Sequence, residues 1–171
     1  MQTKSITLAD NIAEAQYTLG LCYNYADGGL PLDKKAAAVW WTRAAEAGHV
    51  SSQCELGLCY YHGGDSLSED KAQAVKWFMR AAEVHVKAQY WLGSCYCYGE
   101  GGLPEDKKTA ITWWTRAAEG GHIQAQYQLG CCCYYGRDGL EKNLEVSKLW
   151  LSKSAAKGYV EAAKKLAKWF P

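Results

Sequence analysis

Small and apolar residues recur along this chain at nearly constant intervals. The dipeptide Leu-Gly appears four times, at spacings of 37, 36 and 37 residues. Three further registers, one of Trp, one of Leu and one of Asp or Asn, follow the same spacings. The four registers are Leu19-Gly20, Leu56-Gly57, Leu92-Gly93 and Leu129-Gly130; Trp40, Trp77, Trp113 and Trp150; Leu30, Leu67, Leu103 and Leu140; and Asp33, Asp70, Asp106 and Asn143. Four registers that agree indicate an internally repeated structure.

Each repeat predicts two helices, here named helix A and helix B. Helix A contains the Leu-Gly pair, whose small Gly lets a neighbouring helix approach closely. Helix B begins at the Asp or Asn register, because these short side chains accept hydrogen bonds from the first free amides of a helix. Ala37, Trp40 and Ala44 share one face of helix B, so we expect the Trp register to fill the core. Helix B ends at glycines such as Gly48, which suit a left-handed cap.

A single helical hairpin cannot bury both of its faces, whereas stacked hairpins share one elongated core. The sequence therefore predicts an all-α solenoid of four helix-turn-helix repeats. The last segment reads as a fifth helix A that caps the array, with Lys164, Lys165 and Lys168 facing solvent. The predicted segments are an extension and helix start at 1–12, repeats at 13–49, 50–86, 87–122 and 123–159, and a capping helix at 160–171.

The second repeat is one residue short between Glu83 and Lys87. His85 aligns best with His49 and His122 of the other repeats, and this alignment leaves the capping Gly missing. We therefore expect an altered turn after the second helix B.

The charges of the chain nearly cancel, with 19 basic and 18 acidic residues and a formal net charge of +1. This balance argues against nucleic acid as a partner, since phosphate binding requires clustered Lys and Arg. No stretch approaches the ~20 apolar residues of a membrane span. The polar start from Met1 to Ser5 lacks the apolar core of a secretory signal. We expect a cytoplasmic monomer.

The repeated residues resemble the Sel-one-like repeat, a relative of the tetratricopeptide repeat with a longer loop between its helices. The third repeat carries the pattern most fully, in Ala88-Gln89-Tyr90-Trp91-Leu92-Gly93, Gly99-Glu100-Gly101, Trp113-Trp114 and Ala117-Ala118-Glu119-Gly120-Gly121-His122. The resemblance implies a right-handed superhelix that acts as an adaptor and generally has no catalytic centre. One cysteine-rich branch is linked to β-lactam binding, but the helix B segments here contain no Cys, so its disulfide between helices A and B cannot form.

The eight cysteines and three registered histidines are the candidates for chemistry. Cys22, Cys59, Cys95 and Cys132 share one register and are expected to be small core residues. Side chains two positions apart on a helix point in directions about 200° apart. Neither Cys95/Cys97 nor Cys131/Cys133 can therefore chelate a metal alone. A zinc site would require Cys97 and Cys131 to meet. Whether Cys54, Cys97, Cys131 and Cys133 are redox-active stays open.

His49, His85 and His122 share one register beside a turn, which favours a capping or packing role over catalysis. No P-loop, nucleophile elbow or dinucleotide fingerprint is present in the sequence. We expect no catalytic residue, no metal and no cofactor.

The same resemblance implies that the A helices line a concave face. The side chains that face it lie at offsets −6, −3, +1, +4 and +5 from the repeat Gly of each A helix. The side chains selected as partner-binding are Tyr17, Leu21, Asn24, Tyr25, Tyr61, His62, Lys87, Tyr90, Tyr98, Gln124, Tyr127, Tyr134 and Tyr135. Cys54, Cys97 and Cys131 also occupy groove-facing offsets. Tyr offers contact area and a hydroxyl at low entropic cost, so this surface suits an extended or helical peptide. Alternatively, several of these tyrosines pack between adjacent A helices.

The sequence thus predicts an interaction scaffold that binds a protein or peptide on a Tyr-rich face, without catalysis. Two alternatives remain. One is a β-lactam-type hydrolase or a thiol- or metal-dependent enzyme, suggested by the cysteine count. The other is a fragment of a larger adaptor, or a designed repeat array.

Overall fold

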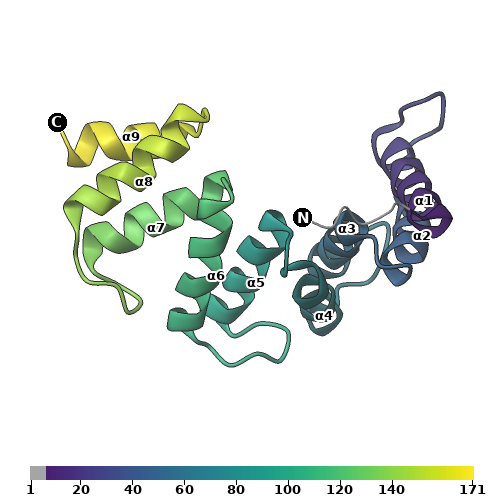
Figure 1. Ribbon diagram of the computed structural model, residues 1–171, viewed down its shortest axis with the longest axis horizontal. Coiled ribbons are helices and arrows are strands. Elements are labelled where there is room, and N and C mark those ends of the chain that lie inside the picture. The colour runs from purple at the N-terminus through teal and green to yellow at the C-terminus, as the bar shows by residue number, and fades with distance from the viewer. Residues whose placement is uncertain (1–6) are drawn as a thin grey trace. The chain divides into compact units, whose positions relative to one another are not determined.

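The computed structural model describes residues 7–171, and within that range it holds nine helices and no strand (Figure 1). The A helices are α1 (Leu8–Tyr25), α3 (Val50–His62), α5 (Val86–Tyr98), α7 (Ile123–Tyr135) and α9 (Val160–Trp169). The B helices are α2 (Lys34–Glu46), α4 (Lys71–Ala81), α6 (Lys107–Glu119) and α8 (Leu144–Ala156). The predicted all-α repeat fold is confirmed. Within the predicted extension, α1 already begins at Leu8, while residues 1–6 lie outside the described part of the chain.

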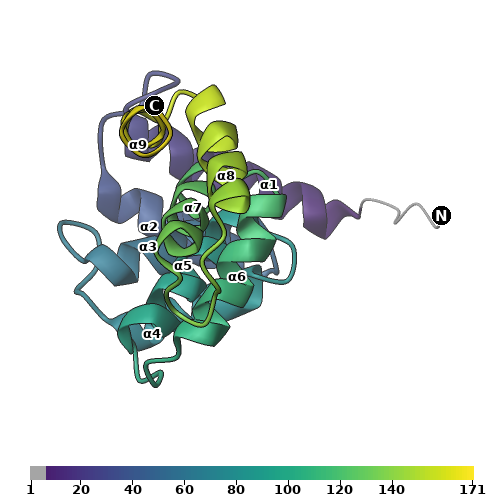
Figure 2. The ribbon, with the colours of Figure 1, turned by 90° about the vertical axis from the view of Figure 1, so that its left-hand side faces the viewer.

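The helices fall into two compact units, which meet in the sequence between His85 and Val86. In the first unit, α1 packs on α2, α2 on α3 and α3 on α4. In the second unit, the same succession runs from α5 to α8, and α9 packs on α8 (Figure 2). Within their units, α2, α6 and α8 are therefore each shared between their own A helix and the next one, as stacked hairpins require.

The core of each hairpin is formed by the residue that directly follows the Trp register on helix B. The side chains at this position are Trp41, Phe78, Trp114 and Leu151, and they are between 0% and 3% exposed. Each lies directly over the repeat Gly of its A helix. A Cβ atom added to Gly93, for example, would lie 2.7 Å from Cδ1 of Trp114. The Gly register therefore exists because a bulky side chain occupies the space where its own side chain would go.

The Trp register itself is only half-buried, so the prediction that it fills the core is wrong. A neighbouring helix position is turned by about 100°, so only one of two consecutive residues can point into the core. The exposed side of each Trp ring is covered by a cation three residues later. These pairs are Trp40–Arg43 (4.7 Å from cation to ring centroid), Trp77–Arg80 (4.6 Å), Trp113–Arg116 (4.9 Å) and Trp150–Lys153 (4.3 Å).

The predicted ends of the B helices are confirmed. Asp33, Asp70, Asp106 and Asn143 are N-cap residues, and each side chain accepts a backbone hydrogen bond from the first helical turn. After three of the four B helices a Gly adopts a positive φ of 86° to 92°; these are Gly48, Gly121 and Gly158. At such angles a residue with a Cβ atom is strained, which explains the glycines.

The turn after α4 differs from the others, as the missing residue predicts. Helix α4 ends at Ala81, and the amide of His85 donates to the carbonyl of Ala81 (3.0 Å). The corresponding amide of His49 donates to the carbonyl of Ala44, five residues earlier (2.9 Å). One residue fewer therefore removes the glycine cap and shortens the loop that closes the helix.

Candidate partner-binding grooves

Each unit holds a groove between successive A helices, at equivalent positions of the repeat. The groove of the second unit has a volume of about 360 Å³ and is formed by α5, α7, α9 and the loop after α7; it is lined by Cys97, Tyr98, Trp114, Tyr127, Gln128, Cys131, Cys132, Tyr135, Arg137, Asp138 and Lys165. The groove of the first unit has a volume of about 240 Å³ and lies mainly along α1 and α3; it is lined by Asn24, Lys34, Trp41, Glu55, Leu58, Cys59, His62, Gly63 and Ser66. The core residues Trp41 and Trp114 correspond between the two grooves.

The structure brings five of the predicted binding residues to these grooves. Tyr98, Tyr127 and Tyr135 line the groove of the second unit, and Asn24 and His62 line that of the first. Tyr98 is 66% exposed and Tyr135 is 46% exposed, so a partner can reach both rings.

The tyrosines at offset −3 pack between adjacent repeats, and of these only Tyr127 also lines one of the two grooves. The ring of Tyr17 lies 4.7 Å from that of His49, and the ring of Tyr90 lies 4.5 Å from that of His122. Tyr127 contacts Tyr159 in the same way at 5.1 Å. Burial raises the pKa of Tyr90 and raises that of Tyr127 to about 12. The contacts of the tyrosines at offset −3 therefore match the alternative in which these rings pack between adjacent A helices.

The remaining predicted residues do not meet in one cavity. Tyr134 stacks on Trp169 of α9, with ring centroids 3.9 Å apart and planes inclined by 13°. Tyr61 lies against Phe78 (6.3 Å between centroids). Tyr25 and Gln124 are exposed, whereas Leu21 and Lys87 are half-buried.

Three charged residues of the second groove were missed by sequence reasoning: Arg137, Asp138 and Lys165. Arg137 and Asp138 follow the end of α7 in a loop, where the offset pattern of the A helices gives no guidance. Asp138 adopts a left-handed conformation with a φ of 61° and accepts a hydrogen bond from the thiol of Cys132 (3.5 Å). Lys165 was expected to face solvent as part of a cap, but its side chain is half-buried at the groove.

The cysteines divide by position. Cys95 and Cys132 are buried in the core as predicted, whereas Cys22 and Cys59 of the same register are half-buried. Cys54 was expected to face the groove but is fully buried, because its helix α3 packs on both α2 and α4. Burial raises the pKa of Cys97 and of Cys131, which keeps these thiols protonated and slow to react at neutral pH. Among residues 7–171, no three His, Cys, Asp or Glu side chains converge as metal ligands.

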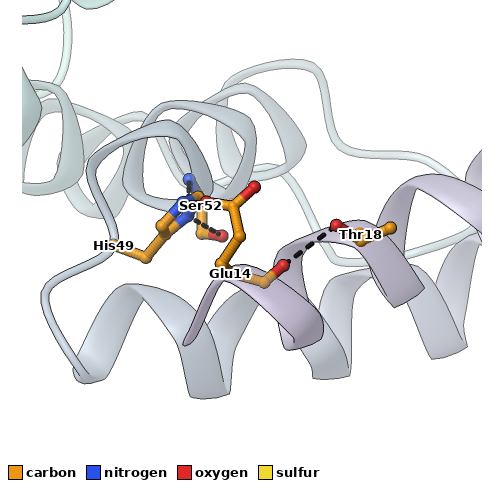
Figure 3. Close-up of polar contacts among 4 residues, drawn as sticks. All are labelled: Glu14, Thr18, His49 and Ser52. Carbon is orange, nitrogen blue, oxygen red and sulfur yellow. Dashed lines mark hydrogen bonds and ion pairs between the residues drawn. The ribbon is translucent and has the colours of Figure 1, made fainter. Parts of the chain in front are cut away.

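A polar chain of three residues in the first unit also went unpredicted (Figure 3). Nδ1 of His49 lies 2.9 Å from Oγ of Ser52 and accepts the backbone N–H of the same Ser52 (3.2 Å). Because Nδ1 accepts that bond, the ring proton lies on Nε2, which donates to Oε2 of Glu14 (3.0 Å). The predicted capping role of His49 is confirmed, and the same holds for His122, whose Nδ1 accepts the N–H of Ala125 (3.4 Å).

The order of carboxylate, imidazole and hydroxyl is that of a hydrolase triad, but the geometry serves to hold helices together. A nucleophile must reach its substrate. The side chain of Ser52 is fully buried (0% exposed), and the neighbouring cavity of about 430 Å³ is lined by Glu14, His49 and Ser51 but not by Ser52. The chain of bonds therefore caps α3 and ties it to α1.

Comparison with known proteins agrees with this repeat architecture. The Sel1 repeat matches residues 13–49, 50–84, 86–122 and 123–159, which is most of the chain. The chain belongs to the Sel1 repeat family. A protective antigen present in uropathogenic Escherichia coli strains, displaying an SLR fold, is 36% identical with a TM-score of 0.81; the match covers 91% of this chain and 33% of the antigen. A Sel1 repeat protein from Oxalobacter formigenes is 33% identical with a TM-score of 0.77, over 95% of this chain and 66% of the other.

This Sel1 repeat chain thus spans about a third of the first relative and about two thirds of the second. An immunity protein from Pseudomonas aeruginosa, at 19% identity and a TM-score of 0.64, shares the fold over 99% of this chain and 61% of its own length. No relative is found among curated proteins. Within the described residues, no helix combines the length and the apolar character needed to cross a bilayer.

Proposed function

We propose that this Sel1 repeat protein is a scaffold without catalytic activity that binds a peptide or protein segment along its A helices. Sel1 repeat proteins generally mediate interactions between proteins, and this general role is the starting point. The observation that carries the proposal is the groove of the second unit, in which the successive A helices α5 and α7 present Tyr98, Tyr127 and Tyr135. Exposed Tyr rings beside a concave surface are typical anchors for a partner.

The recurrence of the groove supports the same conclusion. The first unit forms a groove from the same repeat positions, although its lining differs in sequence. A surface that results from the repeat and varies in its side chains suits recognition, because the fold is retained while the contacts change. We also propose a monomer in the cytosol, in keeping with eight cysteines that are all free thiols.

The enzyme alternatives have weaker physical support. A hydrolase would need an accessible nucleophile, and Ser52 is fully buried. A thiol enzyme would need a thiolate, whereas burial raises the pKa of Cys131 and raises that of Cys132 to about 12. Both thiols are therefore protonated at neutral pH, which is the wrong state for nucleophilic attack.

A random peptide library displayed on phage tests the proposal directly. Peptides selected on the whole protein should lose most of their affinity for the double variant Tyr98→Ala/Tyr135→Ala, since both rings are exposed in the groove. Because Tyr135 also meets Trp169 edge-on, circular dichroism verifies that the variant is folded. Leu144→Ala/Leu149→Ala is the matched control, because these α8 side chains are 44% and 51% exposed outside the groove. If no selected peptide distinguishes the two double variants, the groove is not the binding surface.

A further inference from the structure

Two cations line the groove of the second unit from different elements. Arg137 lies in the loop after α7, with its guanidinium carbon 4.0 Å from the ring centroid of Tyr135. Lys165 lies on α9, with its ammonium nitrogen 4.6 Å from the ring centroid of Trp169. A cation held over an aromatic ring loses part of its freedom before any ligand arrives. Both charges are therefore partly ordered in advance.

The acidic groups near the groove are engaged elsewhere. Lys107 lies 3.3 Å from a carboxylate oxygen of Glu105 and 3.8 Å from one of Asp138. On α9, Glu161 pairs with Lys164 at 2.7 Å. In the described part of the chain, no carboxylate forms an ion pair with Arg137 or Lys165. Asp138 also lines the groove, but its carboxylate lies near Lys107 and accepts the hydrogen bond from Cys132. Among residues 7–171, the two cations of the groove therefore form no ion pair.

The fields of the two cations overlap on one wall of the groove. Burial raises the pKa of the Cys131 thiol, while the hydrogen bond from Tyr127 and the charges of Lys165 and Arg137 oppose that rise. A group that both cations influence lies within electrostatic reach of each. An anion bound beside Cys131 would consequently interact with both charges at once.

We propose that the groove of the second unit selects a peptide segment that carries an acidic side chain, with the carboxylate between Arg137 and Lys165. The inference rests on the proposed scaffold function and specifies its ligand. Arg suits this role because its planar guanidinium can bind both oxygens of a carboxylate. The residue next to the acid would pack on the rings of Tyr98 and Tyr135, whose exposed area lies in the same groove.

The groove of the first unit provides an internal contrast. Gly64 stands at the repeat position of Arg137, and Glu55 stands at that of Gln128. That groove therefore lacks the loop cation and gains an acid, so it is not expected to select acidic segments. Lys34, the cation that lines it, supplies a matched control.

The test uses synthetic copies of peptides selected on the whole protein from a random phage library, measured by fluorescence anisotropy. Peptides that lose binding to Tyr98→Ala/Tyr135→Ala should contain Asp or Glu. Changing that acid to its amide should weaken binding roughly tenfold, the scale of one charge-assisted hydrogen bond. Arg137→Gln/Lys165→Gln should weaken the acidic peptide similarly and make it indistinguishable from its amide, while Lys34→Gln should change nothing. Circular dichroism of each variant verifies its fold.

The outcomes separate this inference from the function on which it rests. Groove-dependent peptides that bind as well with the amide would overturn the acidic preference and leave the scaffold function standing. Loss of binding on amidation of the peptide C-terminus alone would overturn it in favour of a terminal carboxylate. If no peptide depends on Tyr98 and Tyr135, the scaffold proposal fails first.

Discussion

The imidazole of His122 stacks on the phenol ring of Tyr90, with ring centroids 4.5 Å apart and planes inclined by 23°. The same imidazole caps α7 by accepting the backbone N–H of Ala125. One side chain therefore begins an A helix and also packs that helix on the preceding one. His49 joins α3 to Tyr17 of α1 in the same manner. His49 and His122 thus each connect two successive repeats within one unit.

The two roles of His122 can be separated by mutation. His122→Ala should lower the free energy of unfolding by ~1–2 kcal/mol, because it removes both a cap and an aromatic contact. His122→Asn should recover part of this loss, since Asn caps well but cannot stack. Urea denaturation measures both. An Asn variant as stable as the wild type would show that the contact with Tyr90 contributes nothing.

Two neighbouring tryptophans on α6 should differ in their effect on stability. Trp114 is 3% exposed, lies over Gly93 and donates its ring N–H to the carbonyl of Tyr90 (3.2 Å). Trp114→Ala should therefore cost about 3–5 kcal/mol. Trp113→Ala should cost about 1–2 kcal/mol, because that ring is only half-buried and has the guanidinium of Arg116 over it. Thermal unfolding measures both variants. Equal decreases in their free energy of unfolding would contradict the assignment of the core position.

A substitution at the repeat Gly should depend on the residue that covers it. Gly93→Ala would place its Cβ atom 2.7 Å from Cδ1 of Trp114, and should cost about 1–3 kcal/mol through overpacking. In a Trp114→Ala background only the close approach to the carbonyl oxygen of Ala110 (3.1 Å) remains, so the same change should cost much less, and the helix propensity of Ala offsets part of that cost. Additive effects in the double-mutant cycle would refute the contact.

The repeats, the helices and their caps could be predicted because each depends on local patterns that recur four times. The core position could not, because Trp40 and Trp41 lie three and four residues after Ala37, and both spacings fit one helical face. Only the packing of α2 on α1 decides that Trp41 lies over Gly20. A periodic pattern identifies a face to within about 100°, which is one residue.

The grooves were predictable in part, for a related reason. Tyr98 and Tyr135 follow from offsets along a regular helix. Arg137 lies in a loop whose conformation depends on the left-handed Gly136 and Asp138, and no repeat register covers it. Glu14 and His49 are 35 residues apart, so their contact depends on how α1 and α3 pack. Contacts between repeats can therefore be identified only from the structure.

The thiol of Cys132 should resist alkylation until strongly basic pH. Burial, the hydrogen bond to Asp138 and the charge of that carboxylate raise its pKa from 9.0 to about 12. Because the folded state favours the neutral thiol, this contribution to stability is present below pH 9.0 and is lost as the pH rises toward 12. Asp138→Asn should shift alkylation of Cys132 to lower pH, as followed by mass spectrometry of the labelled peptide. An unchanged pH profile would exclude Asp138 as a cause.

The contact between α7 and α9 should depend on Trp169. This residue stacks on Tyr134, meets Tyr135 edge-on at 5.3 Å between centroids, and holds Lys165 over its ring. Trp169→Ala should cost about 1–3 kcal/mol and should speed hydrogen exchange of the α9 amides. Lys168→Ala, an exposed change on the same helix, should leave exchange unaltered.

Because Trp169 positions Lys165 at the groove, its removal should also weaken binding of acidic peptides more than that of their amides. Equal weakening of both would mean that Trp169 supports the helix without positioning the charge.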